Sequence, residues 1–405
     1  MSRSAVQSHR WWGALGILSV IVLIVSACGS SAPTATAVAT AAQTTVATTA
    51  PTAAVTSGET ASMSTLVAQA IAATKANTGP QTEWTGPTTG PTAVKGKFVV
   101  VVSGDQNNGS DLDWATASAQ AATAIGWKNT TLDGKATVSG WEAAVTEAIA
   151  LHPDGIVLAG IDGSAVEPLL KKAVAAGIVI VGQHNSATPG PVADWGEYYN
   201  IGQTVGDIET ALFNYIVADS SGQAHVLLTL DDLYAIAVAK TKFLANLLTT
   251  CPGCTNLGTV NVPSATISTE TAARVTGWVS QYKPPFYLWA CGDALSDYVP
   301  AALQAGGMTP GQIKLIGADG TATAYQRIRD GWQVATVPEP LFEEGWIAID
   351  ELNRAFASQP AYDFTVQAYV VDKANVDLEG GAQNSFDPTN NYKQHFEALW
   401  GVAGS

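Results

Sequence analysis

The sequence predicts an α/β fold, with doubly wound parallel sheets arranged in two lobes. Short runs of apolar, β-branched residues recur along the chain, and segments with helical apolar spacing lie between them. Continuous apolar strands are typical of parallel sheets that helices cover on both faces. The region that could fold this way spans residues 63–405, and a chain of that length usually forms two cores rather than one.

The predicted strands are short runs rich in apolar and β-branched residues. They are KFVVVVS (97–103), GIVLAG (155–160), GIVIVG (177–182), AHVLLTL (224–230), FYLWACG (286–292), IKLIGADG (313–320) and WQVATV (332–337). The segment 139–152 between the first two has Trp141, Val145 and Ile149 on one helical face. The helix predicted in 164–177 ends at Gly177, a residue suited to the position after a helix. Strand–helix–strand repeats of this kind form right-handed βαβ units.

The first 28 residues have the pattern of an export signal. Arg3 and Arg10 precede a stretch from Trp11 to Cys28 that carries no charge. The stretch ends in VSAC, which resembles the lipobox of bacterial lipoproteins, where the peptide is cut before the cysteine and its thiol takes a diacylglyceride. We therefore predict a lipoprotein signal peptide over 1–28 with Cys28 as the lipidation site. The alternative is an uncleaved membrane helix, for which about 18 apolar residues suffice.

Two segments separate this signal from the first predicted strand. Residues 29–62 are almost entirely Ala, Thr, Ser, Val, Pro and Gly, with Glu59 as their one charged residue, and they predict a disordered tether. Residues 63–96 predict a short helix followed by a Pro/Gly-rich lead.

The charge balance excludes several classes of partner. The whole chain has 19 Lys and Arg against 34 Asp and Glu. Removing Arg3 and Arg10 with the signal leaves 17 against 34, a net charge of −17. Such acidity argues against nucleic acid and against an anionic membrane surface as partners. We expect membrane attachment through the lipid anchor only, and a monomer.

Three cysteines remain after Cys28. Cys251 and Cys254 lie in the motif CPGC, which in an exported protein favours a local disulfide over half of a zinc site, because no second Cys or His pair has matching spacing. A redox-active CxxC is disfavoured, since the motif follows a predicted helix instead of opening one. Cys291 lies in an apolar strand.

The loops that follow the predicted strands indicate a ligand site, because ligands of open parallel sheets bind at the carboxyl ends of the strands. These loops (103–113, 160–163, 183–200, 230–234, 291–297, 318–324 and 338–344) contain fourteen Asp or Glu and no Lys or Arg. They also contain aromatic residues, Trp195 and Tyr234 among them. A cleft lined in this way would repel anions. It suits a neutral sugar or polyol, and it also suits an organic cation.

Signatures of enzymes are missing from the sequence. It contains no GxSxG, HExxH, Walker A or GxGxxG motif, and its five histidines have no metal-ligand spacing. His184 alone lies in a predicted cleft loop, where we interpret it as a hydrogen-bonding lining residue. We therefore predict no catalytic residue, no metal and no cofactor.

The ordered set of these segments, from about Lys97 to Val376, resembles the type I periplasmic binding proteins of ABC importers, in the ribose-binding-like branch. The matching pieces are VVVVSGDQNNGSD, HPDGIVLAGIDGSAVEPLLKKAVAAGIVIVGQHN, IKLIGADGTATAYQRIRDG and WQVATVPEPLFEEGWIAIDEL. The resemblance implies two lobes joined by a three-crossing hinge, with the ligand between them. It implies 97–201 and 340–363 as lobe 1, 202–339 and 364–380 as lobe 2, and 381–405 as a C-terminal tail. Some members of this branch carry a lead like 63–96, which we expect along lobe 1.

The resemblance transfers ligand-binding positions unevenly. The Asn of the first loop matches Asn107 or Asn108, the Asp before the hinge matches Asp319, and Glu339 replaces the hinge Gln. An Asp-Arg pair falls on Gln183-His184, an Asn-Asp pair falls on Gly292-Asp293, and a second Arg has no counterpart in DDLYAIAVAK, so both family arginines are missing. The candidate ligand-binding residues are Asp105, Asn107, Asn108, Gln183, His184, Trp195, Tyr234, Asp293, Asp319 and Glu339.

Three functions are consistent with the sequence. The chain is predicted to be a solute-binding lipoprotein that delivers its ligand to an ABC permease on the outer face of the cell membrane. The same module could instead present ligand to a membrane sensor. An enzyme on a similar scaffold is the third possibility, which a nucleophile–base pair in the cleft would support.

Overall fold

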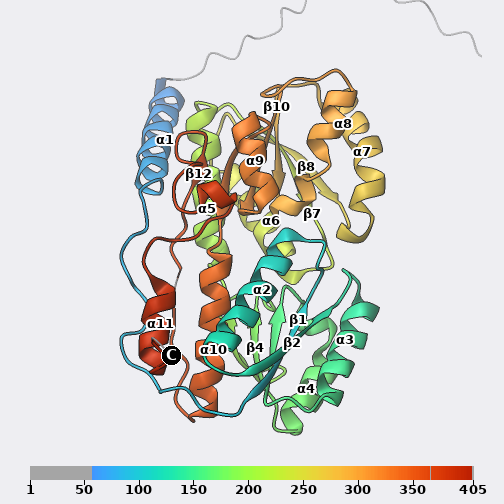
Figure 1. Cartoon of the computed structure of the whole chain (residues 1–405). Coiled ribbons are helices and arrows are strands. Elements are labelled where there is room, and N and C mark those ends of the chain that lie inside the picture. Colours follow the sequence, from blue (N-terminus) through green and yellow to red (C-terminus); the bar gives the residue numbers. More distant parts are fainter. Residues whose placement is uncertain (1–56, 365, 404–405) are drawn as a thin grey trace, which may run out of the picture. The chain divides into compact units, whose positions relative to one another are not determined.

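The computed structural model describes residues 57–364 and 366–403 (Figure 1). The predicted signal peptide, Cys28 and most of the predicted tether lie outside this part of the chain. Helix α1 (Ser57–Ala76) begins inside the segment 29–62, for which the sequence predicted only a disordered tether. The helix of the predicted lead therefore begins at Ser57, upstream of the predicted boundary at residue 63, and Met63 packs against lobe 2.

Lobe 1 contains a six-stranded sheet with the order β2-β1-β3-β4-β6-β5. Its strands are β1 (Phe98–Ser103), β2 (Lys128–Asp133), β3 (Gly155–Ala159), β4 (Val179–Gln183), β5 (Gly190–Val192) and β6 (Glu197–Ile201). Its helices are α2 (Gly109–Ala124), α3 (Val138–Ala150), α4 (Glu167–Ala175), α10 (Leu341–Phe356), α11 (Tyr392–Trp400) and the 3-10 helix η1 (Gly163–Ala165). All pairs in this sheet are parallel except β5–β6.

Lobe 2 contains the second six-stranded sheet, with the order β12-β11-β10-β9-β7-β8. Its strands are β7 (His225–Leu230), β8 (Thr255–Asn261), β9 (Phe286–Ala290), β10 (Ile313–Asp319), β11 (Gln333–Pro338) and β12 (Val371–Asp372). Its helices are α5 (Val205–Asp219), α6 (Ala235–Leu248), α7 (Ile267–Tyr282), α8 (Val299–Ala305), α9 (Ala322–Asp330) and the 3-10 helices η2 (Ser264–Thr266), η3 (Asp293–Ser296) and η4 (Gly381–Gln383). Only the β11–β12 pair is antiparallel.

The central strands of both sheets are buried on both faces, as their continuous apolar runs predicted. Val99–Val102 of β1 are fully buried, and successive residues point into the two separate cores that lie on either side of the lobe 1 sheet. On one of these faces α10 packs against α2. A Cβ on Gly345 would meet the Cβ of Ala117 at 2.5 Å, so glycine permits this close approach of the two helices.

Five strands were not predicted as strands. The edge strands β2 and β8 read KNTTLD and TNLGTVN, and they are partly exposed. Strands β5 and β6 lie within 183–200, which was predicted as a loop, and β12 is only two residues long. Strands β2 and β8 lack continuous apolar runs because they lie at the edges of their sheets, where they are partly exposed.

Besides the passage from η4 in lobe 2 to α11 in lobe 1, the chain crosses between the lobes at three hinge segments, as expected of the fold. The crossings lie between β6 and α5, between β11 and α10, and between α10 and β12. One side chain joins all three. The Nε2 of Gln203, on the first crossing, donates to the carbonyl oxygens of Pro338 on the second and Gln367 on the third, each at 3.2 Å.

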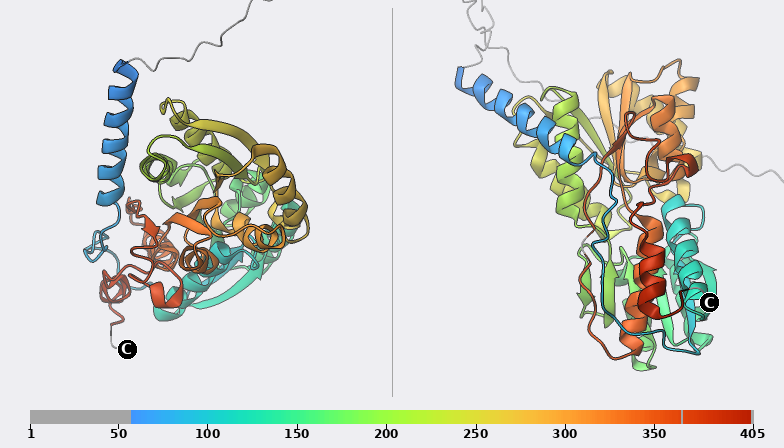
Figure 2. Two further views of the ribbon diagram at one scale, coloured as in Figure 1. Left: turned by 90° about the horizontal axis from the view of Figure 1, so that it is seen from above. Right: turned by 60° about the vertical axis from the view of Figure 1, so that its left-hand side comes forward.

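The N-terminal lead contacts both lobes, so the expectation that it lies along lobe 1 is only partly correct. Met63, Leu66, Val67 and Ala70 of α1 pack into the lobe 2 core beside α5 (Figure 2). The chain then continues to lobe 1, where the ring of Trp84 stacks on His395 and meets Phe396 edge-on.

Backbone hydrogen bonds hold both ends of this lead. Near lobe 2 the Asn77 carbonyl accepts from Val370 N, at 2.8 Å. On lobe 1 the Ala93 N–H donates to the Trp400 carbonyl, at 2.9 Å. The lead is therefore a further connection between the lobes, in addition to the hinge crossings.

The C-terminal residues fold onto lobe 1, whereas the sequence predicted a tail over 381–405. Tyr392, Phe396 and Trp400 of α11 are buried in the lobe 1 core. The Nε1 of Trp400 donates to Asp350 Oδ1 at 2.8 Å, and its ring stacks on Trp346. The spacing of four residues between the three aromatic side chains places them on one face of the helix, which explains why this segment is ordered.

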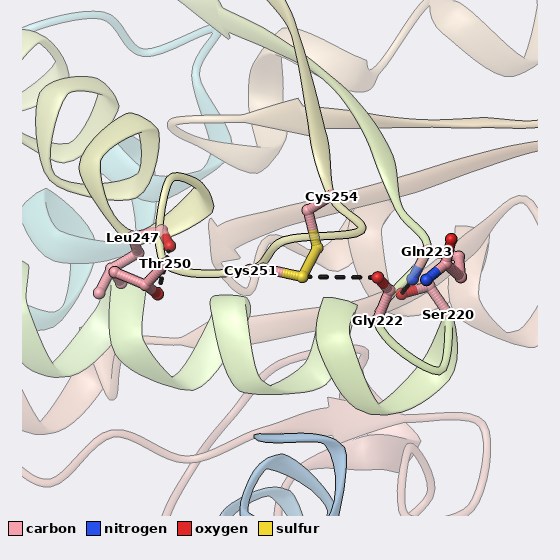
Figure 3. Close-up of a disulfide and its surroundings, with 7 residues drawn as sticks. All are labelled: Ser220, Gly222, Gln223, Leu247, Thr250, Cys251 and Cys254. Atoms are coloured by element: carbon pink, nitrogen blue, oxygen red, sulfur yellow. Dashed lines mark hydrogen bonds between the residues drawn. A yellow bond between two sulfur atoms is a disulfide. The ribbon is translucent and has the colours of Figure 1, made fainter. Parts of the chain in front are cut away.

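Cys251 and Cys254 form a disulfide at the turn between α6 and β8, with an S–S distance of 2.11 Å (Figure 3). This is the pair that the CPGC motif favoured. The Sγ of Cys251 also lies 3.5 Å from the Gly222 carbonyl oxygen, at the turn between α5 and β7. The disulfide thus secures the edge of the lobe 2 sheet. Among the described cysteines, Cys291 has a free thiol and is buried.

Candidate ligand cleft

A cleft between the lobes lies at the carboxyl ends of strands from both sheets and contains about 590 Å³ of empty space, part of it open to solvent. Lobe 1 contributes Asn108, Ser110, Asp111, Trp114, Gly160 and His184 to its lining. Lobe 2 contributes Asp231, Tyr234, Ile236, Ala237, Lys240, Ser264, Cys291, Gly292, Ala294, Leu295 and Asp319. The cavity volume within this space is about 80 Å³.

The first turns of α2 supply one wall. Asn108 caps the helix, and its Oδ1 accepts from the Ser110 N–H at 3.0 Å. Asp111 and Trp114 follow at intervals of three residues, so all three side chains lie on the helix face that meets the cleft. The indole N–H of Trp114 donates to Glu344 Oε2 at 2.5 Å, which fixes the ring from behind.

The floor of the cleft contains a buried lysine. Lys240 of α6 lies 3.2 Å from Asp319 Oδ1 and 3.9 Å from Glu339 Oε1. Burial acts to lower the pKa of Lys240, but Asp319, Glu339 and Glu209 together raise it above its ordinary value, so the lysine is charged. The expectation that no basic residue serves this cleft is therefore wrong: the strand-end loops have none, but helix α6 provides one.

His184 and Glu339 connect the two lobes at the hinge. The Nε2 of His184, at the end of β4, lies 2.9 Å from Glu339 Oε2, on the crossing between β11 and α10. Burial opposes ionisation of Glu339, but His184 and Lys240 lower its pKa below the ordinary value. Glu339 is therefore an anion held between a lysine of lobe 2 and an imidazole of lobe 1, behind the surface of the cleft.

Two residues of the cleft have a strained backbone. The φ angle is 58° at His184 and 86° at Asp319, a region that residues other than glycine rarely adopt. Beside them, Gly292 leaves the space that the Asp319 carboxylate needs, since a Cβ there would lie 2.6 Å from Asp319 Oδ2. Backbone strain of this kind concentrates at sites that bind ligands.

Several buried polar atoms of the lining residues have no hydrogen-bond partner among the described residues. Besides Ser110 Oγ, they include Asp111 Oδ2 and the Tyr234 hydroxyl. Burial, and then the carboxylates of Asp105 and Asp319, raise the pKa of Asp111 well above its ordinary value and favour its uncharged form. Since a buried polar group without a partner is costly, these two atoms are available to a ligand.

The structure places the predicted site residues unevenly. Asn108, His184, Tyr234 and Asp319 line the cleft, and Glu339 lies directly behind it. The other five are outside the lining.

These five residues have other environments. Asp105 accepts from the backbone N–H and side-chain Nδ2 of Asn107, which itself is exposed, so this pair shapes the loop before α2. Gln183 is fully buried, and the Nε1 of Trp195 donates to Glu197 Oε2 within lobe 1.

Asp293 is enclosed within lobe 2 rather than presented to the cleft. Its carboxylate accepts from Gly320 N, Gln333 Nε2 and Thr336 Oγ1 at 2.6–3.0 Å. Burial raises its pKa to about 6. Asp293 therefore supports the loop that carries Asp319, and it is a structural residue rather than a lining one.

The sequence analysis missed Asp111, Trp114, Asp231 and Lys240 as candidate residues. The signal was present for two of them: Trp114 and Lys240 follow the candidates Asn108 and Tyr234 at six residues, on the inward faces of α2 and α6. Because the candidates were taken only from the loops at the strand ends, residues on the following helix were not among them.

The described part of the chain contains no group of three His, Cys, Asp or Glu side chains placed to hold a metal ion. None of the helices that the structure describes is both long and apolar enough to cross a bilayer.

Comparison with known proteins places this arrangement in a family. A family model described as a periplasmic binding protein domain matches residues 98–359. A search of curated proteins found no match.

Solved structures share the fold. A sugar ABC transporter protein from Yersinia enterocolitica is 19% identical with a TM-score of 0.65, over 77% of this chain and 96% of that chain. A solute-binding protein from Agrobacterium vitis, solved with bound allitol, is 21% identical with a TM-score of 0.60, over 70% and 97%. One from Burkholderia graminis, in complex with D-arabinose, is 18% identical with a TM-score of 0.62, over 70% and 98%.

Proteins of this family work outside the cytoplasm and bind solutes without catalysing reactions. The two sheets, the three hinge crossings and the family match over residues 98–359 show that the chain belongs to the periplasmic binding protein family, with the type I, ribose-binding-like fold.

Proposed function

We propose that the chain is an extracytoplasmic solute-binding lipoprotein that captures a small neutral polar ligand, a sugar or a polyol, and delivers it to an ABC importer. The observation that carries the proposal is the cleft between the lobes, where unpartnered polar atoms of Asp111 and Tyr234 stand beside the ring of Trp114. Hydroxyl groups of a sugar could satisfy such atoms while its C–H faces pack on the ring.

The charges of the cleft oppose an anionic ligand. Asp231 and Asp319 line the cleft, and Glu339 lies behind it. Lys240 and Glu339 are within ion-pair distance, as are Lys240 and Asp319, so the lysine charge is already compensated. A phosphate or carboxylate would meet these carboxylates at close range, where two like charges about 4 Å apart repel by about 4 kcal/mol at an effective dielectric constant of 20.

Neighbouring structures support a sugar or polyol. Two of them were solved with allitol and with D-arabinose, respectively, and both proteins have this fold. Both ligands are uncharged polyhydroxy compounds, the class that the cleft chemistry favours.

Binding would act through hinge closure. A ligand that contacts Asp111 of lobe 1 and Asp319 of lobe 2 binds the closed arrangement better than an open one, and this difference in affinity shifts the population toward closure. A permease would then recognise the closed shape. A membrane sensor could read the same shape, and it stays the alternative partner.

The VSAC motif supports the lipoprotein part of the proposal. A thioether-linked diacylglyceride on Cys28 would hold the body at the membrane, since each buried methylene contributes about 0.8 kcal/mol and more than one acyl chain makes the attachment stable.

A thermal-shift screen followed by calorimetry tests the ligand class. We expect at least one of allitol, D-arabinose, D-galactose and related sugars or polyols to raise the melting temperature. Calorimetry with that compound should then show binding at a single site. Each hit is then compared with its phosphate ester, which we expect to bind at least a hundredfold more weakly. Tight binding of a phosphate ester alone would contradict the proposal.

A further inference from the structure

Lys240 is the one lysine or arginine among the described residues that line the cleft. Its side chain is 3% exposed, and its Nζ lies 3.4 Å from the carbonyl oxygen of Cys291 in addition to the two carboxylates. The lysine comes from α6 in lobe 2, whereas Glu339 belongs to a hinge crossing. The positive charge of Lys240 thus lies at the bottom of the cleft, where the two lobes meet.

The charge of Lys240 is set against the carboxylates around it. Asp319 and Glu339 provide two negative charges, and Lys240, within 3.9 Å of both, offsets one of them. Glu209, which is fully buried, also faces Lys240, but burial raises its pKa well above the ordinary value and favours the uncharged acid. The same holds for Asp111 at the wall of the cleft.

This balance determines which ligand the cleft attracts. Without the lysine, the carboxylates would form a site with net negative charge, and an organic cation would be the preferred occupant. With the lysine in place, one of these negative charges is offset, so a cation gains less attraction while it still loses its hydration, whereas the polar atoms remain available to hydroxyl groups.

We propose that Lys240 is the specificity-determining residue that makes this cleft select uncharged polyhydroxy ligands over organic cations. The inference rests on the proposed solute-binding function, and it separates the two ligand classes that the acidic loops alone left open.

The electrostatic potential in the cleft can be measured without knowing the ligand, because Cys291 lines the cleft beside Lys240. The full chain is treated with two methanethiosulfonate reagents, one carrying a trimethylammonium group and one a sulfonate, and mass spectrometry follows the Cys291 peptide. The ratio of the two rates reports the local potential. Any change in the ionisation of the thiol affects both rates equally and cancels in the ratio.

We expect Lys240→Met to raise the ratio of cationic to anionic rates by at least about tenfold. Lys242→Met is the matched control, since Lys242 lies on the same helix but is exposed, and it should leave the ratio unchanged. The double variant Lys240→Met/Glu339→Gln removes one charge of each sign and should return the ratio toward that of the wild type. An unchanged ratio in Lys240→Met, or no reaction at Cys291 in any variant, would overturn the inference.

Binding then tests selection directly. Calorimetry at about pH 6 compares D-galactose with D-galactosamine, and each other hit of the screen with its amino analogue, whose amine is protonated at this pH. The wild type should prefer the neutral member, and Lys240→Met should shift the ratio of the two dissociation constants toward the amine by at least about thirtyfold.

The possible failures are distinguishable. If the wild type binds none of these compounds, the proposed function fails, whatever the thiol reagents show. If the wild type binds a sugar and Lys240→Met binds it with the same preference, Lys240 has only a structural role. Melting temperatures of all variants show whether each is folded, and Lys240→Met/Glu339→Gln keeps the test open if the single variant unfolds.

Discussion

Replacing Asp319 by Asn tests whether this carboxylate contacts ligand or only supports the lysine. The substitution removes the charge and preserves the shape of the side chain at a backbone position with a φ of 86°, which Asn tolerates better than most residues. The Oδ1 atom of Asp319 already accepts a hydrogen bond from Lys240, at 3.2 Å. Its Oδ2 atom accepts none from the residues that the structure describes.

The magnitude follows from these contacts. A hydrogen bond to a charged acceptor contributes about 1.5–3 kcal/mol and one to a neutral acceptor about 0.5–1.5 kcal/mol, so a ligand hydroxyl on Asp319 would lose about 1–2 kcal/mol. This corresponds to an affinity about tenfold lower. Lys240 keeps Glu339 and the Cys291 carbonyl as partners, so the free energy of unfolding should fall by only about 1–2 kcal/mol.

Calorimetry with the best ligand of the screen measures the affinity, and urea unfolding of the ligand-free protein measures the stability. Asp330→Asn is the control, because Asp330 is exposed on α9 and distant in the chain from the lining residues, and it should change neither quantity. Unchanged affinity together with a loss of stability would show that Asp319 supports Lys240 without touching ligand.

Four further predictions concern other parts of the chain. Cys28→Ala should move the protein from the membrane to the soluble fraction, and unchanged fractionation would favour an uncleaved anchor over lipidation. Burial raises the pKa of Glu197 to about 8, so the folded protein holds a proton that the unfolded chain releases, and stability falls as pH rises from about 5 to 8. Glu197→Gln should flatten this fall by up to about 1.4 kcal/mol per pH unit in denaturant titrations, and an unaltered slope would show that Glu197 does not cause it. Replacing Cys251 and Cys254 together by Ser opens a four-residue loop and should cost about 2 kcal/mol of unfolding free energy, with ligand affinity retained as the check that the cleft is intact. Trp84→Ala removes a ring that contacts His395 and Phe396 and should lower the unfolding free energy by about 2–3 kcal/mol, whereas no loss would mean that the lead does not stabilise lobe 1.

The strands that could be predicted from the sequence are those whose own residues show that they are buried on both faces. A strand buried on both faces must be apolar along its length, so β1, β3, β4, β7, β9, β10 and β11 were predicted in order. Strand β2 pairs along one edge only and reads KNTTLD, which resembles a loop in composition. It becomes a strand because β1 offers a paired edge, and that information lies elsewhere in the chain.

The candidate site was predicted less completely because clefts are assembled from two helix faces as well as from loops. The strand-end rule found Asp319 and His184, which follow β10 and β4 directly. It could not separate Asp293, whose carboxylate turns inward to Gln333 and Thr336, from Asp319, which turns outward. Both are acids at the end of a strand, and only tertiary packing decides between them.

The lead described above contacts residues that are synthesised much later than itself. Gln81 N donates to Glu379 Oε1 across 298 residues of sequence, and Val94 N donates to Asn353 Oδ1 across 259. A chain that emerges N-terminus first therefore has no partner for these groups until nearly all of it is available, since such long-range contacts form late in folding.

Docking of the lead takes place in two stages that synthesis separates. Helix α1 gains its partner once α5 has emerged, but Trp84 must wait for α11, which contributes Phe396. A chain interrupted before α11 would leave that indole and the polar groups around it exposed to solvent. The docking of Trp84 on lobe 1 therefore depends on a helix more than 300 residues later in the sequence.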